Sequence, residues 1–167
     1  SEMCIRDRID SSGHELYSIP YCHSKNKEGF LLDAIHFKID NNDNIYIAYI
    51  FKDIIEKVNK NGAKLLWTKS LFHGKRTTIK NIKDMNLPQD IFYKCVELDT
   101  LGNVFILGGS FSKNKSRDVY VFTPNGKYIT TFTLPYPTHY IYIDKQNYLY
   151  SRADMGTVLK KYKMIYK

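Results

Sequence analysis

Ionisable and aromatic side chains stand at corresponding places in three similar segments of this sequence. The segments are FKIDNNDNIYIA (37–48), VELDTLGNVFIL (96–107) and IYIDKQNYLYSR (141–152). Apolar and polar residues alternate before an aspartate in each segment, which predicts a strand whose side chains point to two faces in turn. One predicted face carries the groups that could do chemistry: His36, Lys38, Cys95, Glu97, Tyr140 and Tyr142.

The spacing of these groups predicts two layers. One layer consists of residues at equivalent positions: Lys38, Glu97 and Tyr142. The second layer consists of the residues two positions earlier in each segment. Its members are His36, Cys95 and Tyr140. Lys38 and Glu97 either pair with each other or bind a ligand ion, an anion at Lys38 and a cation at Glu97. Because all six side chains are predicted to point toward the central channel or its mouth, all six are candidate ligand-binding residues. The alternative is a water-filled structural channel that the same groups line.

Basic residues gather in two segments that connect predicted strands. Segment 70–92 carries Lys75, Arg76, Lys80 and Lys83 against Asp84 and Asp90. The second segment, 109–117, carries Lys113, Lys115 and Arg117, which are binding candidates. Arg152, in a third connection, is a further candidate. Long loops on a rigid scaffold are the usual place for binding residues. Solvation of a lysine-rich surface is the alternative explanation.

Sharper motifs fail. Asp40, Asn42 and Asn44 match the first spacings of a calcium loop, but Ile45 replaces the glycine and Phe51 the bidentate acid, so a hairpin turn is favoured. Walker A, G-x-S-x-G, H-E-x-x-H and dinucleotide signatures are absent. No catalytic residue, metal or cofactor is therefore assigned.

The three cysteines, Cys4, Cys22 and Cys95, lack the C-x-x-C spacing of zinc or redox motifs. Cys22 and Cys95 either form a disulfide or remain two buried thiols, and buried thiols are favoured.

Composition favours β structure and excludes a helical bundle. The 167 residues include 14 Tyr and 9 Phe, but only four Ala and five Glu. No apolar run is long enough for a transmembrane helix. The net charge of +8 favours anionic neighbours, but it comes largely from lysine, and codon bias in an AT-rich genome also explains it.

The first eight residues, SEMCIRDR, are interpreted as a non-native leader. Met3–Arg8 back-translates to a sequence that looks like the transposon end used in sequencing libraries, which predicts a metagenomic origin. Such a scar is excluded from fold reasoning. The native sequence is then expected to begin inside a longer protein, near Ile9.

The repeat continues beyond the first strand. Asp40, Asp99 and Asp144 are 59 and 45 residues apart, and each is followed by turn formers and a second apolar run. Asn-Gly turns at 61–62 and 125–126 predict a second hairpin. Four short strands per ~40–50 residues are typical of a propeller blade; a β-sandwich is the alternative.

The repeat resembles the NHL-like, six-bladed β-propeller superfamily of bacterial type. Its blades follow the pattern apolar-x-apolar-Asp-x-x-Gly-Asn-apolar, then Phe-x-x-x-Gly-Lys. The best-fitting residues are Asp99, Gly102, Asn103, Val104, Phe105, Phe122, Gly126 and Lys127. Asp43 and Asn147 depart from it, where the pattern has glycine.

The resemblance implies an all-β, incomplete propeller: about three four-stranded antiparallel blades in an open arc. Residues 9–33 are then the outer hairpin of a truncated blade and its connection, and 34–92 a blade with a long connecting loop. A second blade spans 93–137, and 138–167 is a last, incomplete blade whose fourth-strand slot stays empty. Alternation predicts that one face of the inner strands, which carries Phe37 and Ile39, is core and that the other face points toward the central channel. The sheets of 34–69 and 93–133 are expected to bury Ile39, Ile45, Ile47, Leu98, Val104, Ile106, Val119 and Val121.

The function that this architecture favours is a non-catalytic scaffold that binds a protein, a glycan or a small anionic ligand. The resemblance implies a periplasmic or cell-surface location for the intact protein. Two alternatives stay open. One is a metal-dependent enzyme of the lactonase or lyase type, with His36, Glu97 and Asp33 as its only donors here. The other, ranked last, is an RNA-binding propeller that uses the basic loops.

Overall fold

The computed structural model describes residues 5–9, 12, 14–20, 32–60, 64–82, 85–109, 116–153 and 157–165. Apart from the helical residue Leu32, the regular structure of these residues consists of β-strands. The strands are β1 (Ile5–Ile9), β2 (Glu15–Pro20), β3 (Ile35–Ile39), β4 (Ile45–Tyr49), β5 (Ile55–Val58), β6 (Leu65–Lys69), β7 (Ile79–Ile82), β8 (Met85–Pro88), β9 (Tyr93–Leu98), β10 (Val104–Gly108), β11 (Asp118–Phe122), β12 (Tyr128–Thr133), β13 (Thr138–Ile143), β14 (Tyr148–Ala153) and β15 (Val158–Lys163). No helix among the described residues is long and apolar enough to cross a membrane.

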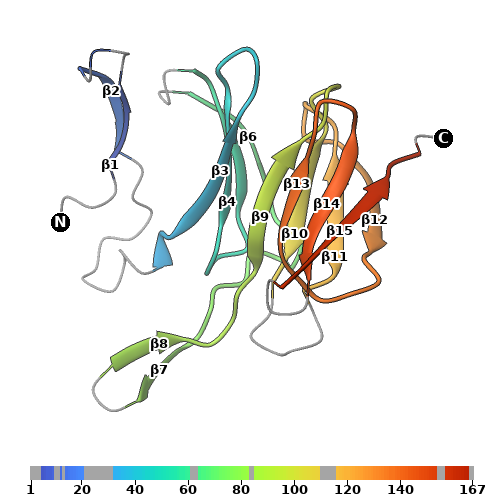
Figure 1. Cartoon of the computed structure of the whole chain (residues 1–167). Coiled ribbons are helices and arrows are strands. Elements are labelled where there is room, and N and C mark those ends of the chain that lie inside the picture. The colour runs from blue at the N-terminus through green and yellow to red at the C-terminus, as the bar shows by residue number, and fades with distance from the viewer. Residues whose placement is uncertain are drawn as a thin grey trace.

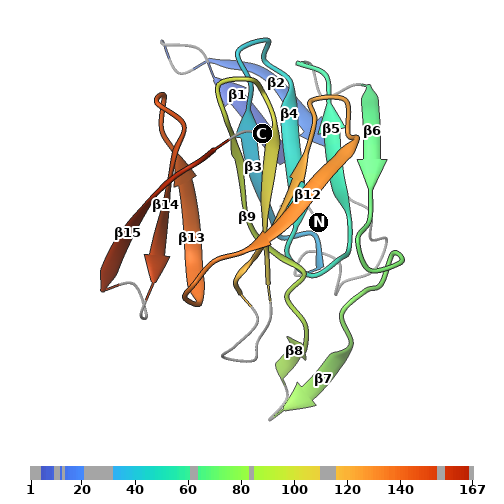
Figure 2. The ribbon, with the colours of Figure 1, turned by 90° about the vertical axis from the view of Figure 1, so that its right-hand side faces the viewer.

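Three antiparallel meanders follow one another along the chain (Figure 1). The first sheet has the order β3-β4-β5-β6, the second β9-β10-β11-β12, and the third β13-β14-β15. In Figure 2 the third sheet diverges from the first two, which overlap in this view, and the earliest strands β3, β9 and β13 lie toward the middle. The predicted all-β, incomplete and open propeller is confirmed, and the strands that follow Asp40 and Asp99 lie in separate sheets.

The three repeated aspartates close three equivalent hairpin turns. Asp40 Oδ1 accepts hydrogen bonds from the backbone N–H groups of Asn42 (2.9 Å) and Asn44 (2.8 Å). Asp99 Oδ1 does the same with residues 101 and 103, and Asp144 Oδ1 with residues 146 and 148. These side chains satisfy donors that a tight turn would leave unpaired. The aspartates therefore stabilise the turns, and the hairpin predicted at Asp40 is present.

One residue of each turn has a positive φ. It is Gly102 (79°) in the second sheet, and Asp43 (63°) and Asn147 (59°) take its place in the other two. Aspartate and asparagine tolerate the left-handed conformation better than other non-glycine residues. The departures from the glycine pattern therefore preserve the turn.

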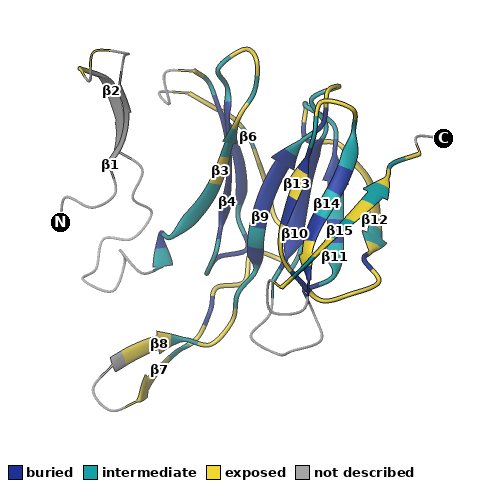
Figure 3. Ribbon diagram, viewed as in Figure 1, coloured by how far each residue is buried: buried dark blue, intermediate teal, exposed yellow. Residues whose placement is uncertain are grey.

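The core lies between the sheets, not within a single one (Figure 3). One cluster joins the first and second sheets through Tyr46, Ala48, Ile55, Tyr93, Val96, Val104, Ile106 and Phe122. Another joins the second and third through Cys95, Phe105, Leu107, Val119, Val121, Leu134, Ile141, Ile143 and Leu149. Both faces of the second sheet are thus buried, which explains why β10 reads VFILG without polar alternation.

Two residues predicted in the core are not buried. Phe37 is 55% exposed and Ile39 is 44% exposed. They lie on β3, on the face of the first sheet that points away from the second sheet. Further along that face Ile45, Ile47, Tyr49 and Val58 are buried together. Alternation correctly placed Phe37 and Ile39 on a common face, but it could not tell whether that end of the face has a cover.

The connection between the first and second sheets is more ordered than a long loop. Within segment 70–92, β7 pairs with β8 in a hairpin that projects away from the sheets (Figure 1). Asn81 Nδ2 donates to Asn86 Oδ1 across it (3.1 Å). At its base, Thr77 Oγ1 accepts from the N–H groups of Gln89 (2.9 Å) and Asp90 (2.8 Å). Its short strands carry no repeat signal, so the sequence did not predict them.

The two ends of the arc differ from the complete sheets. β1 pairs with β2, so the strand includes residues 5–8 of the predicted leader as well as Ile9. The pairing does not test the origin of those residues, which stays a prediction. The third sheet has three strands among the described residues, and an apolar cavity of about 620 Å³ lies between β12 and β15. Phe132, Leu134 and Tyr162 are among the residues that line it.

Candidate functional site

The candidate site lies where the three innermost strands converge. β9 lies between β3 and β13 at the middle of the arc. Lys38, Glu97, Tyr140 and Tyr142 come together there, and we call them the inner-strand cluster. Each comes from a strand that pairs on one side only within its sheet, so its side chain reaches across to the next sheet.

Glu97 is the centre of the cluster. Its side chain is 1% exposed, whereas the side chain of Lys38 is 35% exposed. Lys38 Nζ lies 2.8 Å from Glu97 Oε2, which makes an ion pair without an aligned hydrogen bond at that oxygen. Tyr140 Oη donates to Glu97 Oε1 over 3.3 Å. Three sheets thus meet at one carboxylate, and the pair that the sequence predicted as one possibility is present.

Tyr142 completes the cluster on the exposed side. Its ring is 49% exposed, and its centroid lies 5.6 Å from Lys38 Nζ. It packs against Tyr150 at a centroid distance of 6.2 Å. Tyr140 is 45% exposed. The cluster therefore presents two open aromatic rings beside a paired lysine and carboxylate.

Burial raises the pKa of two groups in this site. Desolvation raises the pKa of Glu97, and the neighbouring Lys38 opposes this effect. Desolvation, together with the nearby Cys95 and Glu97, raises the pKa of Tyr140. Its hydroxyl is therefore a hydrogen-bond donor at neutral pH.

The two remaining members of the predicted layers lie differently. Cys95 is buried in the core between the second and third sheets rather than at the rim of a channel. Desolvation raises the pKa of its thiol to about 12, and Sγ donates to Ile141 O (3.3 Å). Cys95 is therefore a protonated packing group at neutral pH, not a thiolate. Burial lowers the pKa of His36, which is half-buried on β3.

Two of the loop candidates, Arg117 and Arg152, are among the described residues. Arg117 is half-buried, and its Nε donates to Leu134 O over 2.7 Å, which ties two connections together. Arg152 is exposed on β14, opposite Tyr140. Lys113 and Lys115 lie outside the described residues, as do Cys4 and Cys22, so the roles predicted for them stay predictions. Cys95 is a free thiol and not a disulfide partner. No group of three or more His, Cys, Asp and Glu side chains that could hold a metal occurs in the described part of the chain.

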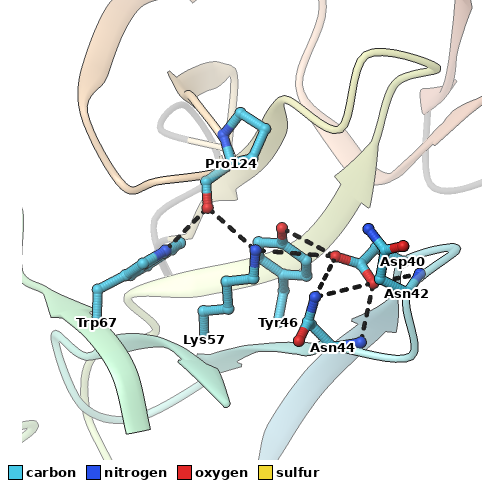
Figure 4. A network of polar contacts seen from close by, with 7 residues as sticks. All are labelled: Asp40, Asn42, Asn44, Tyr46, Lys57, Trp67 and Pro124. Atoms are coloured by element: carbon cyan, nitrogen blue, oxygen red, sulfur yellow. Dashed lines mark hydrogen bonds and ion pairs between the residues drawn. The ribbon is translucent and has the colours of Figure 1, made fainter. Parts of the chain in front are cut away.

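A second polar network aligns the first two sheets at their outer strands (Figure 4). Trp67 Nε1 (3.0 Å) and Lys57 Nζ (3.2 Å) both donate to the carbonyl oxygen of Pro124. Lys57 also lies 3.8 Å from Asp40 Oδ2 and 4.7 Å from the ring centroid of Tyr46. The sequence showed only an Asn-Gly turn here, because a carbonyl acceptor has no residue signature.

Gly126 is required beside this contact. A Cβ atom there would lie 2.9 Å from the Trp67 ring, and the residue has a φ of 77°. Both the close approach and the positive φ favour glycine. The turn and Trp67 are therefore matched across the two sheets.

Comparison with known proteins agrees with this architecture. No family model and no curated protein matches the chain. A Bacteroides caccae protein of unknown function superposes over 95% of the chain with a TM-score of 0.57 and 13% identity. Virginiamycin B lyase from Staphylococcus aureus superposes over 97%, with a TM-score of 0.54 and 14% identity.

The chain spans about half the length of these two structures, 50% and 49%. Identity this low shows the fold alone. The fold and these similarities together define the class: an incomplete, open β-propeller scaffold.

Proposed function

We propose that this chain belongs to a non-catalytic, ligand-binding propeller of the NHL-like type. Its inner-strand cluster binds a neutral glycan. The observation that supports this most directly is the pair of open tyrosine rings beside the Lys38–Glu97 ion pair. Sites for small ligands commonly combine apolar or aromatic surface with a few placed polar groups.

The chemistry of the cluster favours a sugar over a charged ligand. The C–H faces of a pyranose ring pack against the faces of tyrosine rings, as Tyr140 and Tyr142 offer. Lys38, whose side chain is 35% exposed, supplies a donor for sugar hydroxyls, and the hydroxyl oxygen of Tyr140, whose proton is donated to Glu97, supplies an acceptor. Because Lys38 already neutralises Glu97 at 2.8 Å, this ion pair offers no net charge for an ion to balance.

The proposal is tested by titrating the chain with neutral oligosaccharides in a calorimeter. Tyr142→Ala is expected to weaken the best binder about tenfold, since aromatic contact of this kind contributes roughly 1–3 kcal/mol. Tyr136→Ala is the control, because Tyr136 is similarly exposed (44%) and lies in the connection between the second and third sheets. Equal losses in both variants, or no binding by any neutral oligosaccharide, would contradict the proposal.

The proposal includes a periplasmic or cell-surface location for the intact protein. The complete gene should then begin with a signal or lipoprotein sequence. A cytoplasmic start would contradict the location without touching the glycan site. The lyase activity in the name of the S. aureus protein is not transferred, because 14% identity supports only the fold.

A further inference from the structure

A second pocket lies against the connection between the first and second sheets, beside the end of β10. It encloses about 400 Å³. Its lining includes Phe72, Lys75, Arg76, Asp90, Phe92 and Gly109. We call it the loop pocket. None of these residues belongs to the inner-strand cluster.

One wall of the loop pocket is fixed by a buried carboxylate. Asp53 is fully buried and accepts hydrogen bonds from the backbone N–H groups of Leu71 (2.8 Å), Phe72 (2.6 Å) and Gly74 (2.9 Å). Tyr93 Oη also donates to Asp53. The backbone N–H of Asp53 donates to Lys75 O over 2.9 Å. This irregular segment is therefore held in one shape without a ligand, which lowers the entropic cost of binding.

The opposite wall depends on a close backbone approach. Gly109 N donates to Phe92 O (2.8 Å). A Cβ atom at Gly109 would lie 2.4 Å from Ile91 Cγ2 and 2.8 Å from Ile91 O. Only glycine fits against Ile91, so this wall is also built rather than incidental.

The lining combines aromatic surface with an excess of positive charge. Phe72 packs against Phe92 at a centroid distance of 6.0 Å, and edge-on against Tyr120 at 6.0 Å. Lys75 and Arg76 are exposed cations, and Asp90 is the acid that faces them in the lining. The pocket thus offers two cations against one carboxylate beside packed aromatic rings.

We propose that the loop pocket binds a small organic anion: a carboxylate or phosphate monoester with an aromatic or apolar body. Arg76 and Lys75 contact the anionic group, since guanidinium and ammonium groups form strong charge-assisted hydrogen bonds to such oxygens. The apolar body lies against Phe72 and Phe92. Asp90 opposes the anion by repulsion, and so tunes the affinity.

The test uses phenyl phosphate as the probe, titrated into the full chain by calorimetry at low salt. Phenol and inorganic phosphate each carry half of the recognised chemistry and are expected to bind at least about tenfold more weakly. Arg76→Gln should weaken phenyl phosphate binding about tenfold. Asp90→Asn should strengthen it about threefold, and added salt should weaken it. Lys127→Gln makes the same charge change as Arg76→Gln far from the pocket and should leave binding unchanged.

Three results would overturn the proposal. One is equal binding of phenyl phosphate and inorganic phosphate, which indicates charge attraction alone. The second is equal loss in the Arg76→Gln and Lys127→Gln variants, and the third is weaker binding in Asp90→Asn. Thermal unfolding of each variant checks that the fold is intact. Because Tyr142→Ala leaves this pocket untouched, failure of the glycan proposal and failure of this one are separate results.

Discussion

The hairpin turns and the inner-strand cluster are built from equivalent positions of the same repeat, but they obey different rules. Asp40, Asp99 and Asp144 recur and do one task three times, each accepting two backbone N–H groups of its own turn. Two residues earlier stand Lys38, Glu97 and Tyr142, three different side chains that meet one another across sheets. Residues that recur at equivalent positions therefore stabilise turns within a sheet, whereas residues that differ at equivalent positions make the contacts between sheets.

The largest expected effect comes from breaking a repeated turn. Asp99 is buried and accepts from Leu101 N (2.9 Å), Asn103 N (2.8 Å) and Asn103 Nδ2 (2.8 Å). Asp99→Ala leaves these donors without their acceptor, so it should lower the free energy of unfolding by about 2–4 kcal/mol. Leu101→Ala in the same turn is the control, because Leu101 is 66% exposed. Urea unfolding measures both, and equal stability of the two variants would contradict the assigned role.

Removing one partner of the inner-strand cluster should have the next largest effect. Lys38→Met leaves the buried Glu97 carboxylate without its cation and should cost about 1–2 kcal/mol at pH 7, less than a fully buried pair because Lys38 is partly exposed. Glu97→Gln should cost less, since it removes the buried charge and its single amide oxygen still accepts from one of the two partners, Lys38 or Tyr140.

The pH dependence of Lys38→Met has a definite sign. Desolvation already raises the pKa of Glu97, and loss of Lys38 raises it further. An acid with a raised pKa in the folded state destabilises that state when ionised. The cost of Lys38→Met should therefore be complete above that raised pKa and shrink as the pH falls through it. Urea unfolding from pH 8 down to pH 5 tests this, and a cost that grows on acidification would be contrary to it.

Exchange at the positive-φ position of the turn should give a smaller effect. Gly102→Ala forces a Cβ into a φ of 79° and to 3.3 Å from Pro124 Cγ, so it should cost about 1 kcal/mol. Gly102→Asn should cost less, because Asn147 already holds the equivalent position in the third sheet. Thermal unfolding of the pair decides the matter. A greater loss for asparagine would show that contact with Pro124, rather than φ, governs this site.

The smallest effect concerns the charge of Asp40. Burial raises its pKa, but hydrogen bonds from Asn44 and Asn42 and the charge of Lys57 prevail and hold the pKa below the ordinary value of 3.8. Asp40→Asn keeps an acceptor but loses the charge, so the wild type should be more stable by less than about 1 kcal/mol after solvent screening. That advantage should be present above pH 3.8 and disappear as the pH falls through the lowered pKa. Unfolding curves at pH 6 and pH 3 measure it, and an unchanged difference would point away from ionisation.

The sequence predicted the parts of the fold that depend on local rules. Alternation and the Asp turns gave the strands and the order of the sheets, because these depend on residues a few positions apart. The Lys38–Glu97 pair could also be predicted from the sequence, because residues at equivalent positions on neighbouring inner strands have opposite charges. Its proposed role in binding stays a prediction.

The features that were missed depend on contacts between distant segments. Asp53 accepts hydrogen bonds from the backbone of residues 71–74, and Trp67 donates one to Pro124 O. These contacts join residues 18 to 57 positions apart, so no local sequence pattern predicts them. Cys95 was placed at a channel because its face was known, but the core between sheets that covers that face was not. The prediction that Phe37 is buried was wrong for the opposite reason. Its face of β3 was expected to be covered, but no described residue covers it there.

The carbonyl of Pro124 has a consequence for the evolution of this chain. Every amino acid supplies a backbone carbonyl, so no substitution at position 124 can delete the acceptor as long as the turn keeps its path. Whether the contact is kept in evolution therefore depends on the two side chains that donate to this oxygen, Trp67 and Lys57. Loss of either leaves the other in place, so drift at one position is tolerated while the other is retained. Among relatives of this protein, positions 57 and 67 should vary in turn, and seldom together.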